Sequence, residues 1–211
     1  MYILNTICSI ISIQAHRFGP DRFSFHRERM GTLIERELRI AINDGIRVFR
    51  IGMNMGADIW AAERILKLRD QYFPDLTLHC YLPCETQANH WPEHWREPYF
   101  DALARADDVI VLQGRYSKGC IPRRNLAMLD GSRMLLAVHD NVADSGISRA
   151  VSYAESNGIE ALLLRPFEGP DAPAKVCAVH YFSSDHSESR SQTTSTYSAM
   201  FSGGKSAIKR A

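Results

Sequence analysis

The chain has 211 residues, which suffice for one full α/β domain and a tail but are few for two domains. Apolar residues make up 45% and charged residues 23%, and the net charge of +1 gives no general electrostatic reason to expect nucleic acid or an anionic membrane as a partner. No apolar run approaches the length of a membrane span. The five cysteines lack the spacing of a disulfide framework, so we expect reduced thiols and a cytoplasmic location.

Apolar, β-branched runs alternate with segments of helical period along most of the chain. The expected strands are 7–13, 47–51, 76–82, 108–113, 133–138 and 160–166, and the expected helices are 25–45, 57–72, 98–107, 123–131 and 146–158. Near-continuous apolar strands separated by helices are typical of a parallel sheet that is covered on both faces. We therefore predict a Rossmann-like three-layer α/β/α domain with a mainly parallel sheet over residues 1–166.

The last part of the chain, residues 167–211, differs in composition. It is rich in Ser, Thr and charged residues and has no sustained period, so we predict a disordered tail. The stretch "SGGKS" in this tail is similar to the end of a phosphate-binding P-loop, but Ala199 stands where that motif requires Gly and no strand precedes it. We interpret this match as chance.

Two glycines lie between the second strand and the second helix, in the stretch "RIGMNMGADIWAAE". Ligands of open α/β sheets bind beyond the carboxyl ends of the strands, where such loops lead into helix N-termini. Gly52 and Gly56 would allow a positive φ and the close approach of a ligand. Asp58 lies in the first turn of the helix, and its role is open between a dipole partner, a ligand contact and a catalyst. The glycine spacing differs from G-x-G-x-x-G, so ordinary NAD binding is not favoured.

A basic pair follows the fourth strand, in the stretch "YSKGCIPRRN". The glycine and the proline of this run are typical of a loop entering a helix, which would place Arg123 and Arg124 in its first turn, next to Asn125. Cations there oppose the helix macrodipole at a cost of a few tenths to about 1 kcal/mol, and a bound anion would remove that cost. We therefore expect Arg124→Ala to stabilise the empty protein slightly and to weaken a phosphate-bearing ligand. Two solvated arginines on a surface turn are the alternative.

Two further stretches carry candidate residues. The stretch "AHRFGP" follows the first strand and places His16 and Arg17 in a loop that faces the same crevice. The stretch "LHCYLPCETQANHWPEHW" contains C-x3-C followed by H-x3-H. Only five residues separate the two pairs, and Cys80 would be locked inside a strand, so a structural zinc site is not favoured and we expect no metal. A nucleophilic pair of Cys84 with a histidine is conceivable, but no third orienting group can be identified.

The aromatic residues after the third strand have two interpretations. Trp91, Trp95 and Tyr99 would either form a wall of the crevice or cover the edge of the sheet.

The chain resembles the YpsA-like branch of the SLOG superfamily, which is named for its Smf/DprA and LOG members. The likeness covers residues 7–166 and rests on the ordered stretches "GMNMGADIWAAE", "YFPDL", "PCETQ", "YSKGC", "RRNLAMLDGS" and "LLAV". Two loops are also similar. The family's "TGHRP" corresponds to "QAHRF", which keeps His16 and Arg17, and its "GGT" corresponds to "SGI", which keeps Gly146.

This resemblance implies a bacterial or phage protein that binds a nucleotide or a nucleotide-derived ligand, such as ADP-ribose or a nicotinamide derivative, and requires no cofactor. It implies that Gly52, Gly56 and Asp58 contact the ligand, and that the loops of Arg17 and Gly146 line the crevice. Because a carboxylate repels phosphate, we expect Asp58 to accept hydrogen bonds from ribose or base, with the phosphate nearer Gly56, Arg17 and Arg124.

The same resemblance leaves alternative functions open. LOG relatives imply hydrolysis of the N-glycosidic bond of a nucleoside monophosphate, in which Asp58 would activate water or stabilise an oxocarbenium-like centre. The chain has no match to the LOG signature PGGxGTxxE, so we favour ligand binding or sensing over hydrolysis. DprA-like binding of single-stranded DNA is not favoured, because no basic stripe is interleaved with aromatic residues. We expect no membrane partner, and a homo-oligomer is left open.

Overall fold

Strands and helices alternate in the predicted order in the computed structural model, which describes residues 6–15, 23–139, 145–164 and 180–182. The strands are β1 (Ile7–Ser12), β2 (Val48–Ile51), β3 (Thr77–Leu82), β4 (Asp108–Val111), β5 (Met134–Val138), β6 (Glu160–Leu164) and β7 (His180–Phe182). The helices are α1 (Phe23–Asn43), α2 (Ala57–Gln71), α3 (Glu93–Arg105), α4 (Cys120–Leu129) and α5 (Gly146–Ser156).

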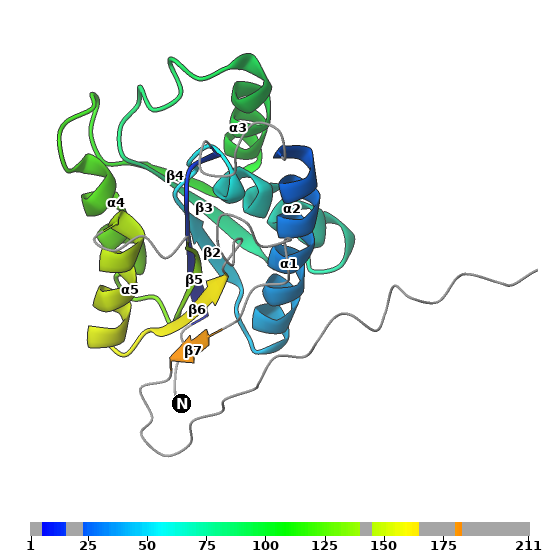
Figure 1. Cartoon of the computed structure of the whole chain (residues 1–211). Coiled ribbons are helices and arrows are strands. Elements are labelled where there is room, and N and C mark those ends of the chain that lie inside the picture. Colours follow the sequence, from blue (N-terminus) through cyan, green and yellow to red (C-terminus); the bar gives the residue numbers. More distant parts are fainter. Residues whose placement is uncertain (1–5, 16–22, 140–144, 165–179, 183–211) are drawn as a thin grey trace, which may run out of the picture.

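The strands form one sheet in the order β4-β3-β2-β1-β5-β6-β7, and every pairing except that of β6 with β7 is parallel. Helices α1, α2 and α3 cover one face of the sheet, and α4 and α5 cover the other (Figure 1). The predicted Rossmann-like three-layer α/β/α architecture is confirmed. Between successive parallel strands a helix runs back across the sheet, so that the next strand starts at the same edge as the one before, which is why strands β1 to β6 are parallel.

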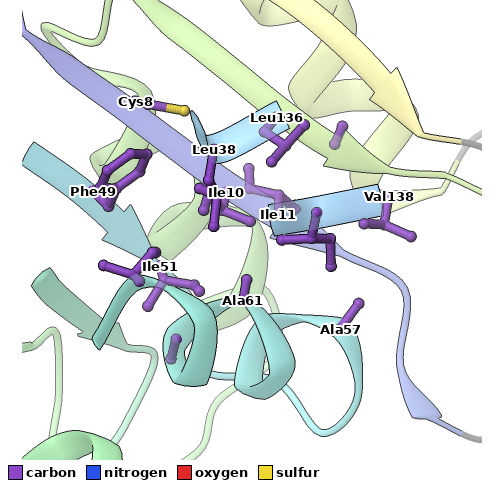
Figure 2. Packing of buried hydrophobic residues seen from close by; sticks show 14 of the residues in the cluster. Cys8, Ile10, Ile11, Leu38, Phe49, Ile51, Ala57, Ala61, Leu136 and Val138 are labelled. Atoms are coloured by element: carbon purple, nitrogen blue, oxygen red, sulfur yellow. The ribbon is translucent and has the colours of Figure 1, made fainter. Parts of the chain in front are cut away.

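The central strands are buried on both faces. Figure 2 shows apolar side chains of β1, β2 and β5 meeting those of α1 and α2, with Ile10, Ile51 and Leu136 less than 2% exposed. Burying each such side chain contributes roughly 1.5–3 kcal/mol. Strand β1 therefore lies in the centre of the core.

Helix α1 begins two residues earlier than predicted, and helices α3 and α4 begin five and three residues earlier. Helix α3 begins at Glu93 and contains Pro98, and α4 begins at Cys120 and contains Pro122 in its first turn. Backbone N–H groups in the first turn of a helix have no acceptor within the helix, so Pro122 costs no hydrogen bond there. The sequence therefore predicted helices α3 and α4 but placed their first residues too late, because Pro98 and Pro122 lie inside the helices and not before them.

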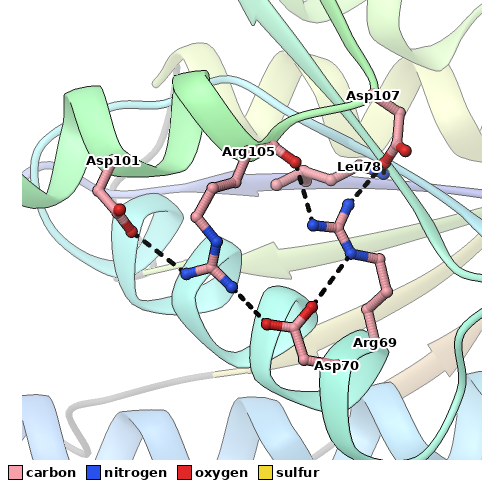
Figure 3. A network of polar contacts seen from close by, with 6 residues as sticks. All are labelled: Arg69, Asp70, Leu78, Asp101, Arg105 and Asp107. Atoms are coloured by element: carbon pink, nitrogen blue, oxygen red, sulfur yellow. Dashed lines mark hydrogen bonds and ion pairs between the residues drawn. The ribbon is translucent and has the colours of Figure 1, made fainter.

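Ion pairs join α2 and α3 at the amino ends of β3 and β4 (Figure 3). Arg105 bridges Asp70 and Asp101 at 2.6 and 3.3 Å, and Arg69 contacts Asp107 at 3.0 Å. Asp107 also accepts a hydrogen bond from the Leu78 amide at 2.8 Å. Exposed pairs of this kind contribute little individually, but together they fix the position of α3 on α2.

The aromatic residues before and within α3 pack inward. Trp95 and Tyr99 are 6% and 2% exposed, and the Trp95 ring lies 6.1 Å from that of Trp60 in α2. Trp91 meets Tyr99 edge to face at 5.1 Å. Of the two interpretations, the described contacts favour packing of α3 against the rest of the domain over an open aromatic wall.

Strand β7 extends the sheet beyond the predicted domain boundary at residue 166. It pairs antiparallel with β6 through Leu162 and Tyr181, so three residues of the segment predicted as a tail belong to the sheet. A strand this short has no periodicity of its own and is defined by its pairing with β6. The remaining residues of that segment lie outside the described ranges. Among the helices in those ranges, none combines the length and apolar character needed to cross a membrane.

Candidate functional site

The candidate site lies at the carboxyl edge of the parallel sheet. The chain runs outward from β1 to β4 and then returns to place β5 on the other side of β1, so the topological switch point lies between β1 and β5. Ligands of open α/β sheets bind at such points. The loop that carries His16 and Arg17 follows β1, and both residues lie outside the described ranges.

Gly56 ends the β2–α2 turn and precedes the first residue of α2. Its φ is +114°, a conformation that side-chain-bearing residues rarely adopt. A Cβ here would lie 3.0 Å from the Ala15 amide nitrogen, and Ala15 donates a hydrogen bond to the Met55 carbonyl at 2.8 Å. Gly56 is therefore required by its own conformation and by the close packing of the chain that leaves β1.

Gly52 begins the same turn, but its φ is not positive. A Cβ at this position would overlap the guanidinium of Arg124. Arg124 Nη1 donates a hydrogen bond to the Gly52 carbonyl. The space that the sequence assigned to a ligand at Gly52 is filled by an arginine of the protein itself.

Arg124 corrects a prediction from the sequence. Its side chain is completely buried, and it lies just past the first turn of α4 rather than in that turn, as the sequence predicted, or on a solvated surface turn, the alternative. It donates to the Tyr81 carbonyl at 3.2 Å, to Asn54 Oδ1 at 3.3 Å and to Asn125 Oδ1 at 2.9 Å, in addition to Gly52. Burial lowers the pKa of this guanidinium, and Asp58 opposes that effect. Because protein acceptors satisfy Arg124, its removal is expected to destabilise the empty protein, the opposite of the sign expected from the helix dipole.

Asp58 is also completely buried, in the first turn of α2. Its Oδ2 accepts a hydrogen bond from the Asn54 amide at 2.9 Å, whereas its Oδ1 has no hydrogen-bond partner among the described residues. Burial raises the pKa of this carboxyl from the usual 3.8 to about 6, while the charge of Arg124 and hydrogen bonding from the hydroxyl and amide of Ser12 and the amide of Asn54 act to lower it. The Ser12 groups therefore lie near the carboxylate, although no hydrogen bond of ordinary length to Oδ1 is made within the described ranges. A buried acceptor of this kind is costly unless a donor reaches it.

Asn54 connects the two charged residues. Its backbone amide donates to Asp58, and its side-chain oxygen accepts from Arg124. Asn125 extends the network on the α4 side, where its side-chain oxygen accepts from Arg124 Nε. The structure therefore brings Gly52, Asp58, Arg124 and Asn125 together in one buried network.

Arg123 and Gly146 lie outside this network. Arg123 is exposed, and its Nη2 donates to Gln113 Oε1 at 2.6 Å and to Ser117 Oγ at 3.1 Å. Gly146 is the first residue of α5, and no described atom lies within 4 Å of the place that its Cβ would occupy. Among the glycines proposed for the ligand that the structure describes, Gly146 is the one with no described atom within 4 Å of the place of a Cβ.

Sequence reasoning missed four polar groups near this edge. Ser145 caps α5 by accepting a hydrogen bond from the Ser148 amide at 3.0 Å, and Ser148 Oγ lies 3.1 Å from His139 Nε2 at the end of β5. Gln87, in the loop after β3, donates to the Met53 carbonyl at 2.5 Å. The cap at Ser145 could have been found from its position before a helix, whereas the contact of Gln87 depends on the pairing of β2 with β3.

The cysteines of the C-x3-C stretch are buried, whereas the histidines of the H-x3-H stretch are exposed to solvent. Cys80 lies inside β3, where burial raises the pKa of its thiol to about 12, and Cys84 is 2% exposed. His90 and His94 are exposed. Within the described ranges, no group of three or more His, Cys, Asp or Glu side chains is arranged to hold a metal ion.

Comparison with known proteins identifies the family. A family model described as the YspA SLOG family (YpsA) matches residues 26–167 of this chain. The chain belongs to this family. The resemblance inferred from the sequence is thereby confirmed, and the matched range contains both the β2–α2 turn and α4.

Curated relatives are similar over the same region. A UPF0398 protein of Bacillus cereus (strain G9842) is 30% identical over 127 residues, which are 59% of this chain and 68% of the relative. A UPF0398 protein of Bacillus thuringiensis (strain Al Hakam) has the same identity and coverage. These names describe no ligand or activity, so the function of this YpsA family member has to be argued from its own residues.

Proposed function

We propose that this YpsA family protein binds a nucleotide or a nucleotide-derived ligand at the carboxyl edge of its sheet. The observation that carries the proposal is Asp58 Oδ1, which is completely buried at the N-terminus of α2 and accepts no hydrogen bond of ordinary length from the described residues, although the hydroxyl and the amide of Ser12 lie close to the carboxyl. An ionised carboxylate only accepts hydrogen bonds, so the missing partner has to be a donor. A ribose hydroxyl is such a donor, and its hydrogen bond to a buried carboxylate would contribute about 1.5–3 kcal/mol.

The phosphate of this ligand would lie away from Asp58, because like charges repel in a buried site. Gly146 offers open space at the N-terminus of α5, whose first amides attract anions. The proposed ligand thus extends from Asp58 toward Gly146 across the switch point, with His16, Arg17 and exposed Arg123 as further contacts. Arg124 and Asn125 would support the site without contacting the ligand, since their side chains are buried. ADP-ribose and nicotinamide nucleotides have the required combination of ribose and phosphate.

The test is calorimetric titration of the wild type with AMP, ADP-ribose, NAD and nicotinamide mononucleotide. A ligand at 100 times its dissociation constant also raises the free energy of unfolding by about 2.7 kcal/mol. Asp58→Asn should weaken the ligand roughly ten- to a hundred-fold, whereas Asp108→Asn, an exposed carboxyl at the opposite edge of the sheet, should leave affinity unchanged. Equal affinity of Asp58→Asn and wild type would remove the proposal.

A second candidate is LOG-like hydrolysis of a nucleoside monophosphate. The observation that favours it is the raised pKa of Asp58, about 6, because a carboxyl that titrates near neutral pH can exchange protons with water or a leaving group. Incubation with the common nucleoside monophosphates distinguishes the two functions. Free base above the no-enzyme level, lost in Asp58→Asn, would support hydrolysis, and intact nucleotide that nevertheless binds would support the binding function.

We also propose that the protein acts in the cytoplasm. The four cysteines within the described ranges, Cys8, Cys80, Cys84 and Cys120, are buried free thiols. Reduced thiols are typical of that compartment.

A further inference from the structure

The peptide bond between Met53 and Asn54 is held from both sides. Its carbonyl oxygen accepts a hydrogen bond from Gln87 Nε2 at 2.5 Å, and its N–H donates to Asp58 Oδ2 at 2.9 Å. The carbonyl and the N–H of a trans peptide point in opposite directions. Gln87 and Asp58 therefore fix the orientation of one peptide plane, although Gln87 lies in the loop after β3 and Asp58 lies in the first turn of α2.

This peptide follows a residue with an unfavourable backbone conformation. Met53 has a φ of +55° and is the one non-glycine residue with a positive φ in the described ranges. Its side chain is completely buried, so the turn cannot relax outward without losing core contacts. A left-handed conformation at a non-glycine residue persists only where neighbouring interactions hold it.

Rotation of this peptide would change what Asp58 meets. The Asn54 N–H would turn away, and the Met53 carbonyl oxygen would turn toward the carboxylate and repel it. Arg124 holds the preceding carbonyl, that of Gly52, and the side chain of Asn54, but it donates no hydrogen bond to the Met53 carbonyl. Gln87 is the side chain that supplies this contact.

We propose that Gln87 is a positioning residue for the Asp58 site: by holding the Met53 carbonyl, it keeps the Asn54 N–H on one carboxylate oxygen and leaves the other oxygen to the ligand. This inference rests on the proposed function for the ligand, but the part that concerns Asp58 applies to the empty protein as well. Gln87 acts through the peptide and not by contact with the ligand.

The consequence is a change in the titration of Asp58. A hydrogen bond to the ionised form lowers the pKa of a carboxyl, so loss of the Asn54 N–H would raise it. The other described groups that face Asp58 are the hydroxyl and amide of Ser12, which do not titrate in this range, Arg124, whose guanidinium stays protonated, and Cys80, whose pKa is raised to about 12 by burial. None of these groups changes its charge between pH 4 and 8, so a shift in that range reports on Asp58.

The experiment measures the pKa of Asp58 in the ligand-free protein by carboxyl ¹³C NMR, with the resonance assigned by Asp58→Asn. Gln87→Met keeps the length of the side chain and removes the donor, and Gln71→Met makes the same change at an exposed position at the end of α2. We expect Gln87→Met to raise the pKa of Asp58 by roughly half to one unit and Gln71→Met to leave it unchanged. Gln87→Leu, which also removes the donor while leaving an apolar side chain of similar size in place, serves as the second variant if Gln87→Met does not fold.

The ligand measurement separates this inference from the proposed function. With ADP-ribose as the probe, we expect Gln87→Met to weaken binding by less than about two-fold at pH 7 and by roughly two- to five-fold at pH 6, because the raised pKa leaves a smaller fraction of Asp58 ionised. An unchanged pKa of Asp58 in a folded Gln87 variant would overturn the positioning role. If wild type binds none of the tested nucleotides while the pKa of Asp58 still shifts, the proposed function fails and the positioning role stands.

Discussion

The β2–α2 turn and the start of α5 both bring a glycine to the carboxyl edge of the sheet, yet their surroundings differ. Gly52 and Gly56 in the first region are enclosed by Arg124 and by the backbone of Ala15. Gly146 in the second region has no described atom near its missing side chain. In the first region the missing side chain allows other groups of the protein to come close, whereas in the second region no described group occupies the space.

This difference teaches how to interpret glycines in a ligand-binding turn. Absence of a side chain shows that something comes close, but it does not identify whether a ligand or a protein group does so. In the β2–α2 turn, the group that approaches Gly52 is the buried guanidinium of Arg124. The proposed contact to a ligand in this turn is a carboxylate oxygen of Asp58. Substitutions in the two regions should therefore have very different consequences for the empty protein.

The largest expected effect comes from removing the arginine that fills the first region. Arg124→Ala leaves the acceptors of Gly52, Tyr81 and Asn54 without their donor and should lower the free energy of unfolding by about 3–5 kcal/mol. Arg123→Ala is the matched control and should change it by less than about 0.5 kcal/mol, because that side chain is exposed. Urea denaturation of both variants measures the difference, and equal stability of the two would contradict the buried network.

A substitution at Gly52 tests the same contact from the other side. Gly52→Ala should displace the Arg124 guanidinium, with overpacking and the weakened charged hydrogen bonds together costing about 2–5 kcal/mol. In the Arg124→Ala background the same change should cost much less, because the space is vacant. Simple additivity of the two losses in a double-mutant cycle would show that Gly52 is needed for another reason.

The buried carboxylate predicts a pH dependence of stability. The pKa of Asp58 in the folded protein, about 6, exceeds the usual 3.8, so the folded state binds this proton more tightly than the unfolded chain does. The resulting stabilisation is complete below about pH 4 and is lost as the pH rises through 6, and it amounts to about 3 kcal/mol at most. Comparing the unfolding of wild type and Asp58→Asn from pH 4 to 8 measures it. We expect the variant to gain stability relative to wild type as the pH rises, and a constant difference would mean that Asp58 titrates normally.

The smallest effects on the empty protein compare the two kinds of glycine directly. Gly56→Ala forces a side chain into a positive φ and against Ala15, which should cost about 1–3 kcal/mol. Gly146→Ala should stay within about 0.5 kcal/mol of wild type, because its surroundings are open. Under the proposed function, Gly146→Ala should nevertheless weaken the binding of ADP-ribose. Melting curves and titration of this variant check both statements, and a stable Gly146→Ala protein with full affinity would move the phosphate elsewhere.

Much of the candidate site could be located from sequence, but the roles within it could not. The glycine run and the basic pair indicated the right loops, because the carboxyl ends of parallel strands meet at one edge of the sheet. The sequence also identified Asp58 and Arg124 as a carboxylate and a cation near the same crevice. It assigned Arg124 to a phosphate in the first turn of a helix, with a solvated surface arginine as the alternative, because charged residues are rarely buried and the carbonyl groups that satisfy it are distant in the chain.

The sequence by itself determined the order of strands and helices, the parallel sheet and the family, because hydrophobic periodicity and turn residues are local properties of the chain. Only the tertiary structure decided what occupies Gly52, which oxygen of Asp58 remains without a donor and why Gln87 matters. Gly52 and Arg124 are 72 positions apart, and Gln87 lies 34 positions from Met53. Contacts over such separations exist only once neighbouring strands have chosen their partners and register, and that choice places the loops after β2 and β3 beside α4.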